Sequence, residues 1–446
     1  GRPLDWGMSS VLFLPESAAF AALTPLPLGI DGLFALSAVL NVVALYGAVR
    51  LVAGRRREGA APVGWSLTVL VVYGVFAITE TSASRDSFEL ASLLLTTTYY
   101  SAAVLATIAA VGILRRALDR SAHDGLGVVL PVSLGVLTLV STLTNPLFIG
   151  WAVAPLGLLL GVVAARASLR RTALALLATL LAGSVAGLLL RIPFQEWITK
   201  TGVGYAQPAE WLASLEYYTG FALARLTTPG GVLAALLLTA LIVLAVWQSV
   251  RVRDVGARLV ATSAWLLPLA VVIGGIALGT HATRYLQPAL FAPLLALVAA
   301  ARVIAVPRPR VLLATAATAL LALSVVSIPR LTAAATRPDD DLDCVTDWVD
   351  ASGRTGGGQF WTVRLPKLHL QHPEQLVQLH SDLDAYGWLV NRADYDVGEV
   401  SFLVDDGADD SWQLPQGAQP ETIIPCGRYR ILDFGSELLQ IGPSRV

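Results

Sequence analysis

The sequence predicts a multi-spanning α-helical membrane protein with a small α+β or β-rich domain at its C-terminal end. Of the 446 residues, 55% are hydrophobic and 14% are charged, whereas soluble domains contain about 45–50% apolar and about 25% charged residues. Acidic and basic residues are also distributed unevenly along the chain. The part before Arg330 has 13 acidic and 22 basic residues, and the remainder has 19 and 9. This composition excludes a disordered chain, a nucleic-acid-binding protein and an ordinary cytosolic enzyme.

Long apolar segments support the membrane prediction. A bilayer core about 30 Å thick needs about 20 apolar residues in helical form. We count ten such segments, near residues 32–53, 63–79, 97–114, 126–143, 147–165, 172–191, 230–249, 259–279, 286–304 and 311–328.

Clusters of arginine predict how these segments are oriented. The clusters follow every second segment, at Arg50 and Arg55–Arg57, Arg115–Arg120, Arg166–Arg171, Arg251–Arg258 and Arg302–Arg310. The positive-inside rule places all of them in the cytoplasm. The sequence then opens outside the cytoplasm with no visible signal peptide, so we expect one further helix upstream and eleven in the full protein.

The C-terminal part has the composition of a soluble domain. We assign 1–329 to the transmembrane bundle, with amphipathic helices at its outer face, and 330–446 to a domain outside the cytoplasm. The only two cysteines of the chain, Cys344 and Cys426, both fall in this domain. Since disulfides persist in oxidising compartments, we expect these two cysteines to form one.

Local patterns predict the elements of this domain. The acidic run Asp339–Asp341 suits the start of a helix over 341–351, and the Gly-rich Thr355–Gly358 is expected to break the chain. Five β-like runs follow, at Phe360–Leu365, Leu376–His380, Tyr386–Val390, Val400–Val404 and Tyr429–Phe434. Three aromatic residues suit either the core or a sugar-binding surface: Trp361, Tyr386 and Trp388.

Acidic residues before Arg330 gather on the outer side of the predicted topology. The centres of the apolar segments hold almost no ionisable residues, which argues against a transporter and favours a site at the outer face. Three outer stretches have amphipathic helical patterns, namely 15–23, 85–96 and 207–225. In the last, four residues share one predicted face: Trp211, Leu215, Tyr218 and Ala222.

The most specific local string is THATRYLQP, from Thr280 to Pro288. Arg284 can grip a phosphate with its planar guanidinium, and His281 can donate to a phosphate or move a proton. Tyr285 suits the membrane interface. The alternative is a polar loop that anchors at lipid headgroups.

The layout of the chain, together with residues 281–288, resembles the C-type (GT-C fold) integral-membrane glycosyltransferases, which use polyprenyl-phosphate sugars as donors. The resemblance covers the whole chain in layout but only this short string as a motif. It implies that a carboxylate of the first outer loop acts as general base or helps to hold a metal. Asp5 is the matching candidate, followed by Glu16. The family often has a paired acidic motif there, whereas Asp5 stands beside Trp6.

The same resemblance implies sugar transfer at the outer leaflet, to a glycan, lipid or protein acceptor. Arg284 and His281, with Arg85 or Arg191, would stabilise the departing lipid phosphate. Further substrate-binding candidates are Tyr285, Glu80 and Asp86. The sequence leaves open whether a divalent metal, Mg²⁺ or Mn²⁺, takes part.

Two other functions are compatible with the sequence. An O-antigen ligase or polymerase type of enzyme would use a long outer loop with Arg and His, but the 192–229 loop has Arg225 and no His. A non-catalytic membrane scaffold with an extracytoplasmic binding domain is the second. Only two of the 31 Lys and Arg residues are lysines, a bias typical of high-GC bacteria, so we expect a bacterial plasma membrane protein whose partners are lipids and not nucleic acid.

Overall fold

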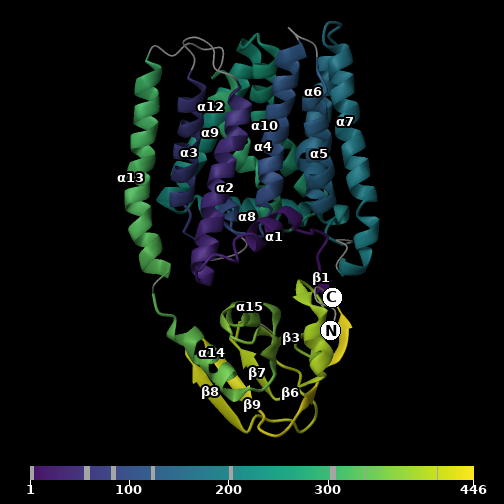
Figure 1. Ribbon diagram of the computed structural model, residues 1–446, viewed down its shortest axis with the longest axis vertical. Coiled ribbons are helices and arrows are strands. Elements are labelled where there is room, and N and C mark those ends of the chain that lie inside the picture. The colour runs from purple at the N-terminus through teal and green to yellow at the C-terminus, as the bar shows by residue number, and fades with distance from the viewer. Residues whose placement is uncertain are drawn as a thin grey trace. The chain divides into compact units, whose positions relative to one another are not determined.

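The computed structural model describes residues 5–54, 61–81, 87–121, 126–199, 204–301, 308–335, 337–408 and 410–445 (Figure 1). The chain divides into two compact units. The first, called the bundle, comprises Val11–Pro193 and Gly202–Leu331. The second, called the C-terminal unit, comprises Gly1–Ser10, Phe194–Thr201 and Thr332–Val446. Two segments from early and middle parts of the chain therefore belong to the same unit as the C-terminal domain.

Long apolar helices form the bundle. Six helices among the described residues are long and apolar enough to cross a membrane: α2 (Ile30–Ala53), α4 (Ser101–Ser121), α7 (Arg170–Leu189), α9 (Pro229–Arg251), α10 (Val255–Ala277) and α13 (Pro309–Ala335). Shorter apolar stretches accompany them: α3 (Pro62–Ile78), α5 (Val129–Thr144), and the π-helical turn η2 (Ile149–Val153) leading into α6 (Ala154–Ala164). Length and composition thus agree with a membrane protein.

The segment predicted as one span over 286–304 is not a continuous helix. Its described part consists of short pieces: η5 (Thr283–Leu286), α11 (Pro288–Phe291), η6 (Pro293–Leu295) and α12 (Ala296–Ala299). Pro288 and Pro293 each lack the N–H that a continuing helix would need, and their rings crowd the preceding turn.

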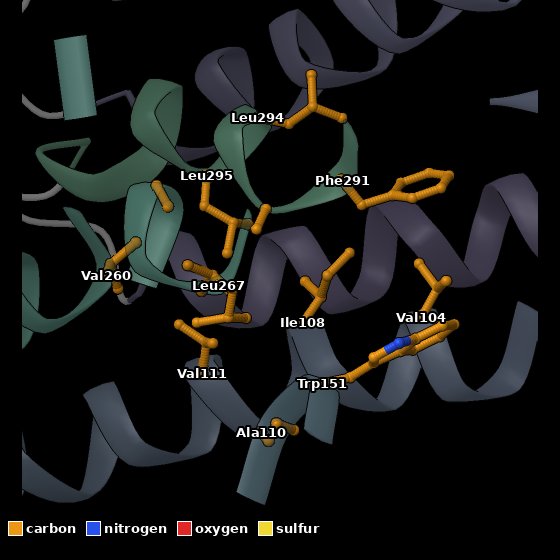
Figure 2. Packing of buried hydrophobic residues seen from close by; sticks show 14 of the residues in the cluster. Val104, Ile108, Ala110, Val111, Trp151, Val260, Leu267, Phe291, Leu294 and Leu295 are labelled. Atoms are coloured by element: carbon orange, nitrogen blue, oxygen red, sulfur yellow. The ribbon is translucent and has the colours of Figure 1, made fainter. Parts of the chain in front are cut away.

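Burial explains how this irregular backbone is accommodated. Phe291 and Leu295 are each 1% exposed. Figure 2 shows them among buried side chains of neighbouring helices, including Ile108 of α4 and Leu267 of α10. Non-helical backbone is tolerated at membrane depth where protein surrounds it.

Helices α5 and α7 approach each other closely because α7 carries glycine at the contact. A Cβ atom at Gly187 would lie 2.6 Å from the Leu139 carbonyl oxygen, and one at Gly183 would lie 2.8 Å from the Gly135 carbonyl oxygen. Small residues let membrane helices pack backbone against backbone. Glycine at these positions therefore sets the α5–α7 distance.

Short helices gather at one end of the bundle, where Figure 1 labels α1 and α8. They are α1 (Leu14–Ala21), η1 (Ser92–Leu95), η4 (Pro208–Glu210) and α8 (Trp211–Arg225), and η3 (Ile192–Trp197) follows α7. The helices predicted over 15–23 and 207–225 are confirmed. The helix predicted over 85–96 is wrong among its described residues, where only η1 forms.

The apolar face predicted for α8 is divided between buried and exposed positions. Tyr218 is buried, together with Ser214 one turn earlier. Trp211 and Leu215 are 52% and 38% exposed. Apolar periodicity does not distinguish the face that packs on protein from a face that meets lipid.

A five-stranded sheet forms the core of the C-terminal unit. Its order is β3-β2-β7-β9-β8, with β2 parallel to β3 and β7, and β9 antiparallel to β7 and β8. The strands are β2 (Gly356–Gly358), β3 (Leu376–Gln378), β7 (Phe402–Asp405), β8 (Thr422–Cys426) and β9 (Tyr429–Asp433). The helices are α14 (Asp340–Ser352) and α15 (Phe360–His369), with the short turns η7 (Pro373–Gln375) and η8 (Arg392–Val397).

Three small pairs of strands complete this unit. They are β1 (Trp6–Gly7) with β5 (Val390–Asn391), β6 (Glu399–Val400) with β10 (Leu439–Gln440), and β4 (Asp384–Tyr386) with β11 (Gly442–Arg445). The first pair attaches the start of the described chain to the C-terminal domain.

Side chains alternate across the sheet as strand geometry requires. Phe402 and Val404 of β7 join a cluster with Val345 of α14 and Val363 of α15, so both helices cover one face. Leu403, between them in sequence, joins a second cluster with Leu379 on the opposite face.

Two predictions for this unit are confirmed. Helix α14 forms, and the Asp339 side chain accepts a hydrogen bond from the Leu342 amide at its start. The Cys344–Cys426 disulfide is present and closes a sequence separation of 82 residues. It connects α14 to the end of strand β8.

Two other predictions are wrong. The run Phe360–Leu365 lies in helix α15 and not in a strand. The glycines expected to break the chain form the buried strand β2. A Cβ at Gly356 would lie 2.1 Å from the Phe402 ring, so large neighbours occupy the space that a side chain would need.

Candidate active site

Glu16 is a buried carboxyl group at the α1 end of the bundle. Its side chain is 8% exposed, and Oε1 accepts a hydrogen bond of 3.2 Å from the Ala102 amide in the first turn of α4. Oε2 is buried without a hydrogen-bond partner among the described residues. Burial raises the pKa of Glu16, and the backbone hydrogen bonds oppose that rise. The group therefore holds a proton more readily than an exposed glutamate does.

The start of α1 is fixed by the end of α5. The Leu12 amide donates to the Thr144 carbonyl oxygen at 2.8 Å, and the Leu14 amide donates to the Thr144 hydroxyl at 2.8 Å. Phe13 between them has a φ of 49° and begins the helix. These bonds position Glu16 one turn later, at the start of α4.

Tyr100 stands two residues before Ala102, whose amide binds Glu16, and its side chain interacts with Arg284. Burial raises the pKa of Tyr100, whereas the charge of Arg284 and a hydrogen bond with its guanidinium lower it. The Tyr100 ring stacks on Phe13, with centroids 5.7 Å apart, and meets Trp151 edge-on at 6.1 Å. An aromatic cage thus holds the tyrosine between α1 and the loop of Arg284.

Arg284 is half-buried among tyrosines. Its guanidinium carbon lies 5.4 Å from the centre of the Tyr285 ring. Burial raises the pKa of Tyr285, Tyr205 and Tyr218, and the positive charge of Arg284 opposes this rise for each of them. The arginine is therefore the cationic centre of this cluster.

Hydrogen bonds hold the 280–288 loop in place. The Tyr218 hydroxyl bonds the Thr280 hydroxyl at 2.6 Å, and Ser214 donates to the Thr280 carbonyl oxygen at 2.7 Å. The Trp151 indole N–H donates to the Tyr285 carbonyl oxygen at 2.9 Å, and Gln287 donates to the Tyr99 carbonyl oxygen at 2.9 Å. Helix α8, η2 and the start of α4 together set the position of Arg284.

His281 lies at the exposed edge of the same loop. Its Nδ1 is 3.9 Å from a carboxylate oxygen of Glu210, and its ring meets Tyr217 edge-on. An apolar hollow of about 350 Å³ lies between η4, the start of α8, and α10. It is lined by Pro208, Trp211, Ile273, Ile276 and Ala277.

The structure brings four of the residues predicted from sequence into this region: Glu16, His281, Arg284 and Tyr285. Asp5 lies elsewhere, in the C-terminal unit, where its carboxylate pairs with Arg392 at 2.6 Å. Glu80 caps η1 by accepting from the Ala91 and Ser92 amides, each at 2.7 Å.

The remaining predicted residues have other positions. Arg191 donates to the Leu143 carbonyl oxygen at 2.6 Å, at the end of α5, and burial lowers its pKa. Arg85 and Asp86 lie outside the described residues. Among those that are described, no group of three His, Cys, Asp or Glu side chains is placed to hold a metal ion.

Sequence reasoning missed Tyr100, Trp151 and Glu210 as parts of this region. Tyr100 stands at the start of an apolar segment, where an aromatic residue is common at the membrane interface. The tyrosine pair Tyr99 and Tyr100, at the start of a predicted span, was the available signal.

The arrangement combines a proton-accepting group of raised pKa with a fixed cation, both at one end of an apolar bundle. It can accept a proton from a hydroxyl group and bind an anionic group such as a phosphate. No protein-family model matches the chain, and no curated protein or solved structure matches it significantly.

Proposed function

We propose that this protein is a glycosyltransferase that moves a sugar from a polyprenyl-phosphate carrier to a cell-envelope acceptor. The observation that carries the proposal is the network around Tyr100. The Tyr100 side chain interacts with Arg284, and the amide of Ala102, two residues later in the chain, binds the Glu16 carboxyl group. The start of α4 thereby links a carboxyl group and a guanidinium group that are distant in sequence.

The proposal includes a topology with ten membrane crossings and the candidate site at the outer face of a bacterial plasma membrane. Two long helices support this orientation. Arg50 and Arg251 lie in the last turns of α2 and α9, whereas Asp31 lies in the first turn of α2. The disulfide supports an extracytoplasmic C-terminal unit, because disulfides persist in oxidising compartments.

Glu16 is the carboxyl group that we assign as general base. Asp5, the first candidate in sequence order, is engaged with Arg392 in the other unit. The raised pKa of Glu16 makes its carboxylate a stronger proton acceptor near neutral pH than an exposed glutamate.

The proposed reaction is a direct displacement at the anomeric carbon. Glu16 takes the proton of the acceptor hydroxyl, and the hydroxyl oxygen forms the new bond to the sugar. The bond between the sugar and the phosphate oxygen breaks, and the lipid phosphate leaves with the electron pair. Arg284 stabilises the negative charge that develops on this phosphate.

The apolar hollow beside Glu210 suits the isoprenoid part of the donor. Its lining is formed by Trp211, Ile273 and neighbouring apolar residues, and two of the lining residues, Pro208 and Trp211, flank Glu210 in the sequence. An isoprenoid chain placed there would keep its apolar surface away from water.

The experiment measures transfer of a labelled sugar from a polyprenyl-phosphate donor in membranes that contain each variant. We expect Arg284→Ala to lower the rate by roughly 10²–10³-fold, as for loss of a charge-stabilising donor. We expect Glu16→Gln to lower it by about 10²–10⁴-fold, as for loss of a general base.

Two matched variants serve as controls. Arg251→Ala removes an exposed arginine at the C-terminal end of α9, and Glu216→Gln changes an exposed glutamate on α8. Both are expected to retain the wild-type rate. Wild-type transfer by Arg284→Ala and Glu16→Gln would refute the catalytic proposal and favour the membrane scaffold.

A further inference from the structure

Helix α15 of the C-terminal unit has exposed apolar residues along one side. Four of its ten residues are exposed, and three of these are large and apolar: Trp361, Leu365 and Leu368, at 45%, 40% and 42%. Their spacing of four and then three residues places them on one side of the helix. The fourth, Arg364, contributes a positive charge to the same side. Exposed apolar residues that lie side by side often mark an interaction surface.

The neighbouring helix provides an internal comparison. Helix α14 packs against α15 on the same face of the sheet. Its exposed positions include Asp340, Asp343 and Asp347. The two helices share one core but differ in their outward chemistry, so the apolar face of α15 is not a general property of this unit.

Covalent connectivity limits how far this face can be from a membrane. Helix α13 is one of the helices able to cross a membrane, and only 6% of its most apolar window is buried. Four residues separate its end at Ala335 from the start of α14 at Asp340, and four residues extend at most about 14 Å. Only this short link separates the apolar helix α13 from α14, the helix against which α15 packs.

We propose that the exposed face of α15 binds the lipid headgroup region of the membrane that the bundle spans. Tryptophan is favoured at this interface, because its ring is apolar and its N–H is polar. Leu365 and Leu368 would enter the boundary between headgroups and acyl chains. The contact would hold the C-terminal unit against the bilayer, independently of any catalytic role of the bundle.

The cysteine content permits a direct test on the full chain. Both cysteines are held in the disulfide, so an introduced cysteine is the only thiol available for a nitroxide label. Leu365→Cys and Leu368→Cys place the label on the proposed contact. Leu438→Cys is the matched control, because it replaces a leucine that is 50% exposed elsewhere in the unit. Wild-type protein is treated with the same label and should take up none, which verifies that the disulfide is intact.

Each labelled protein is reconstituted into nanodiscs of phosphatidylcholine and phosphatidylglycerol. Paramagnetic resonance then compares collision of the label with oxygen, which concentrates in lipid, and with a water-soluble nickel chelate. We expect both α15 labels to favour oxygen, at a depth of about 5–10 Å, and the Leu438 label to favour the chelate. Chelate accessibility at α15 equal to that of the control would overturn the proposal. Shielding of the α15 labels from both reagents would also overturn it, because it would indicate that protein covers this face.

Discussion

The Cys344–Cys426 disulfide gives a prediction whose magnitude follows from chain connectivity. The bond closes a loop with a sequence separation of 82 residues. For a loop of this length, loss of unfolded-state entropy corresponds to about 4.5 kcal/mol at 25 °C. Reduction of the bond should lower the free energy of unfolding of the C-terminal unit by this amount. For a unit of this size, the midpoint of thermal unfolding should fall by about 15–20 °C.

Pulse proteolysis across a urea series can measure this loss in the full-length protein. The readout is cleavage within residues 332–446, which reports on the C-terminal unit separately from the bundle. The wild type is compared with and without a phosphine reductant. The double variant Cys344→Ala with Cys426→Ala is the control and should not respond to the reductant. A difference below about 1 kcal/mol in the wild type would refute the loop-closure argument.

Two further predictions concern the bundle. Burial raises the pKa of Glu16 above its ordinary value of 4.5, so its stabilising contribution is complete below that pH and is lost as the pH rises through the folded-state pKa. Glu16→Gln should therefore gain thermal stability relative to the wild type as the pH is raised, and parallel pH profiles in scanning fluorimetry would contradict this. Gly187→Ala should destabilise the bundle by about 1–3 kcal/mol, because its Cβ would lie 2.6 Å from the Leu139 carbonyl oxygen. Gly161→Ala on α6 has nothing within 4 Å of the new Cβ; it should be neutral or stabilising, and equal losses in the two variants would show that the close contact is not the cause.

Structural features that depend on residues close together in the sequence were predicted well. Runs of apolar residues identified the long helices, because every backbone group in a membrane-spanning helix is paired within the segment. The acidic run before α14 identified its start, because a cap involves residues only a few positions apart. Where a segment contains two prolines, as in 286–304, the same apolar signal did not distinguish a continuous helix from short buried turns.

The errors in the C-terminal unit arose from contacts between distant parts of the chain. Gly356–Gly358 has a local composition typical of a break, yet it forms a central strand. The reason is that Phe402, Leu379 and Val363 occupy the volume that side chains there would need. Phe360–Leu365 has high β-propensity, but burial of Val363 against the sheet, and of Phe360 against Tyr386 and Trp388, favours a helix. Such packing overrides local propensity.

For the candidate site, the sequence by itself determined which residue types were available: the carboxylates Asp5 and Glu16 and the Arg284 loop. Only the tertiary structure decided that Glu16, rather than Asp5, contacts the start of α4, where Tyr100 interacts with Arg284. The choice depends on two contacts over long sequence separations, namely the pairing of Asp5 with Arg392 and the contact of Glu16 with the start of α4. Residue order specifies local hydrogen bonding and apolar periodicity directly. The location of a side chain that depends on a distant partner is decided only when the whole chain has packed.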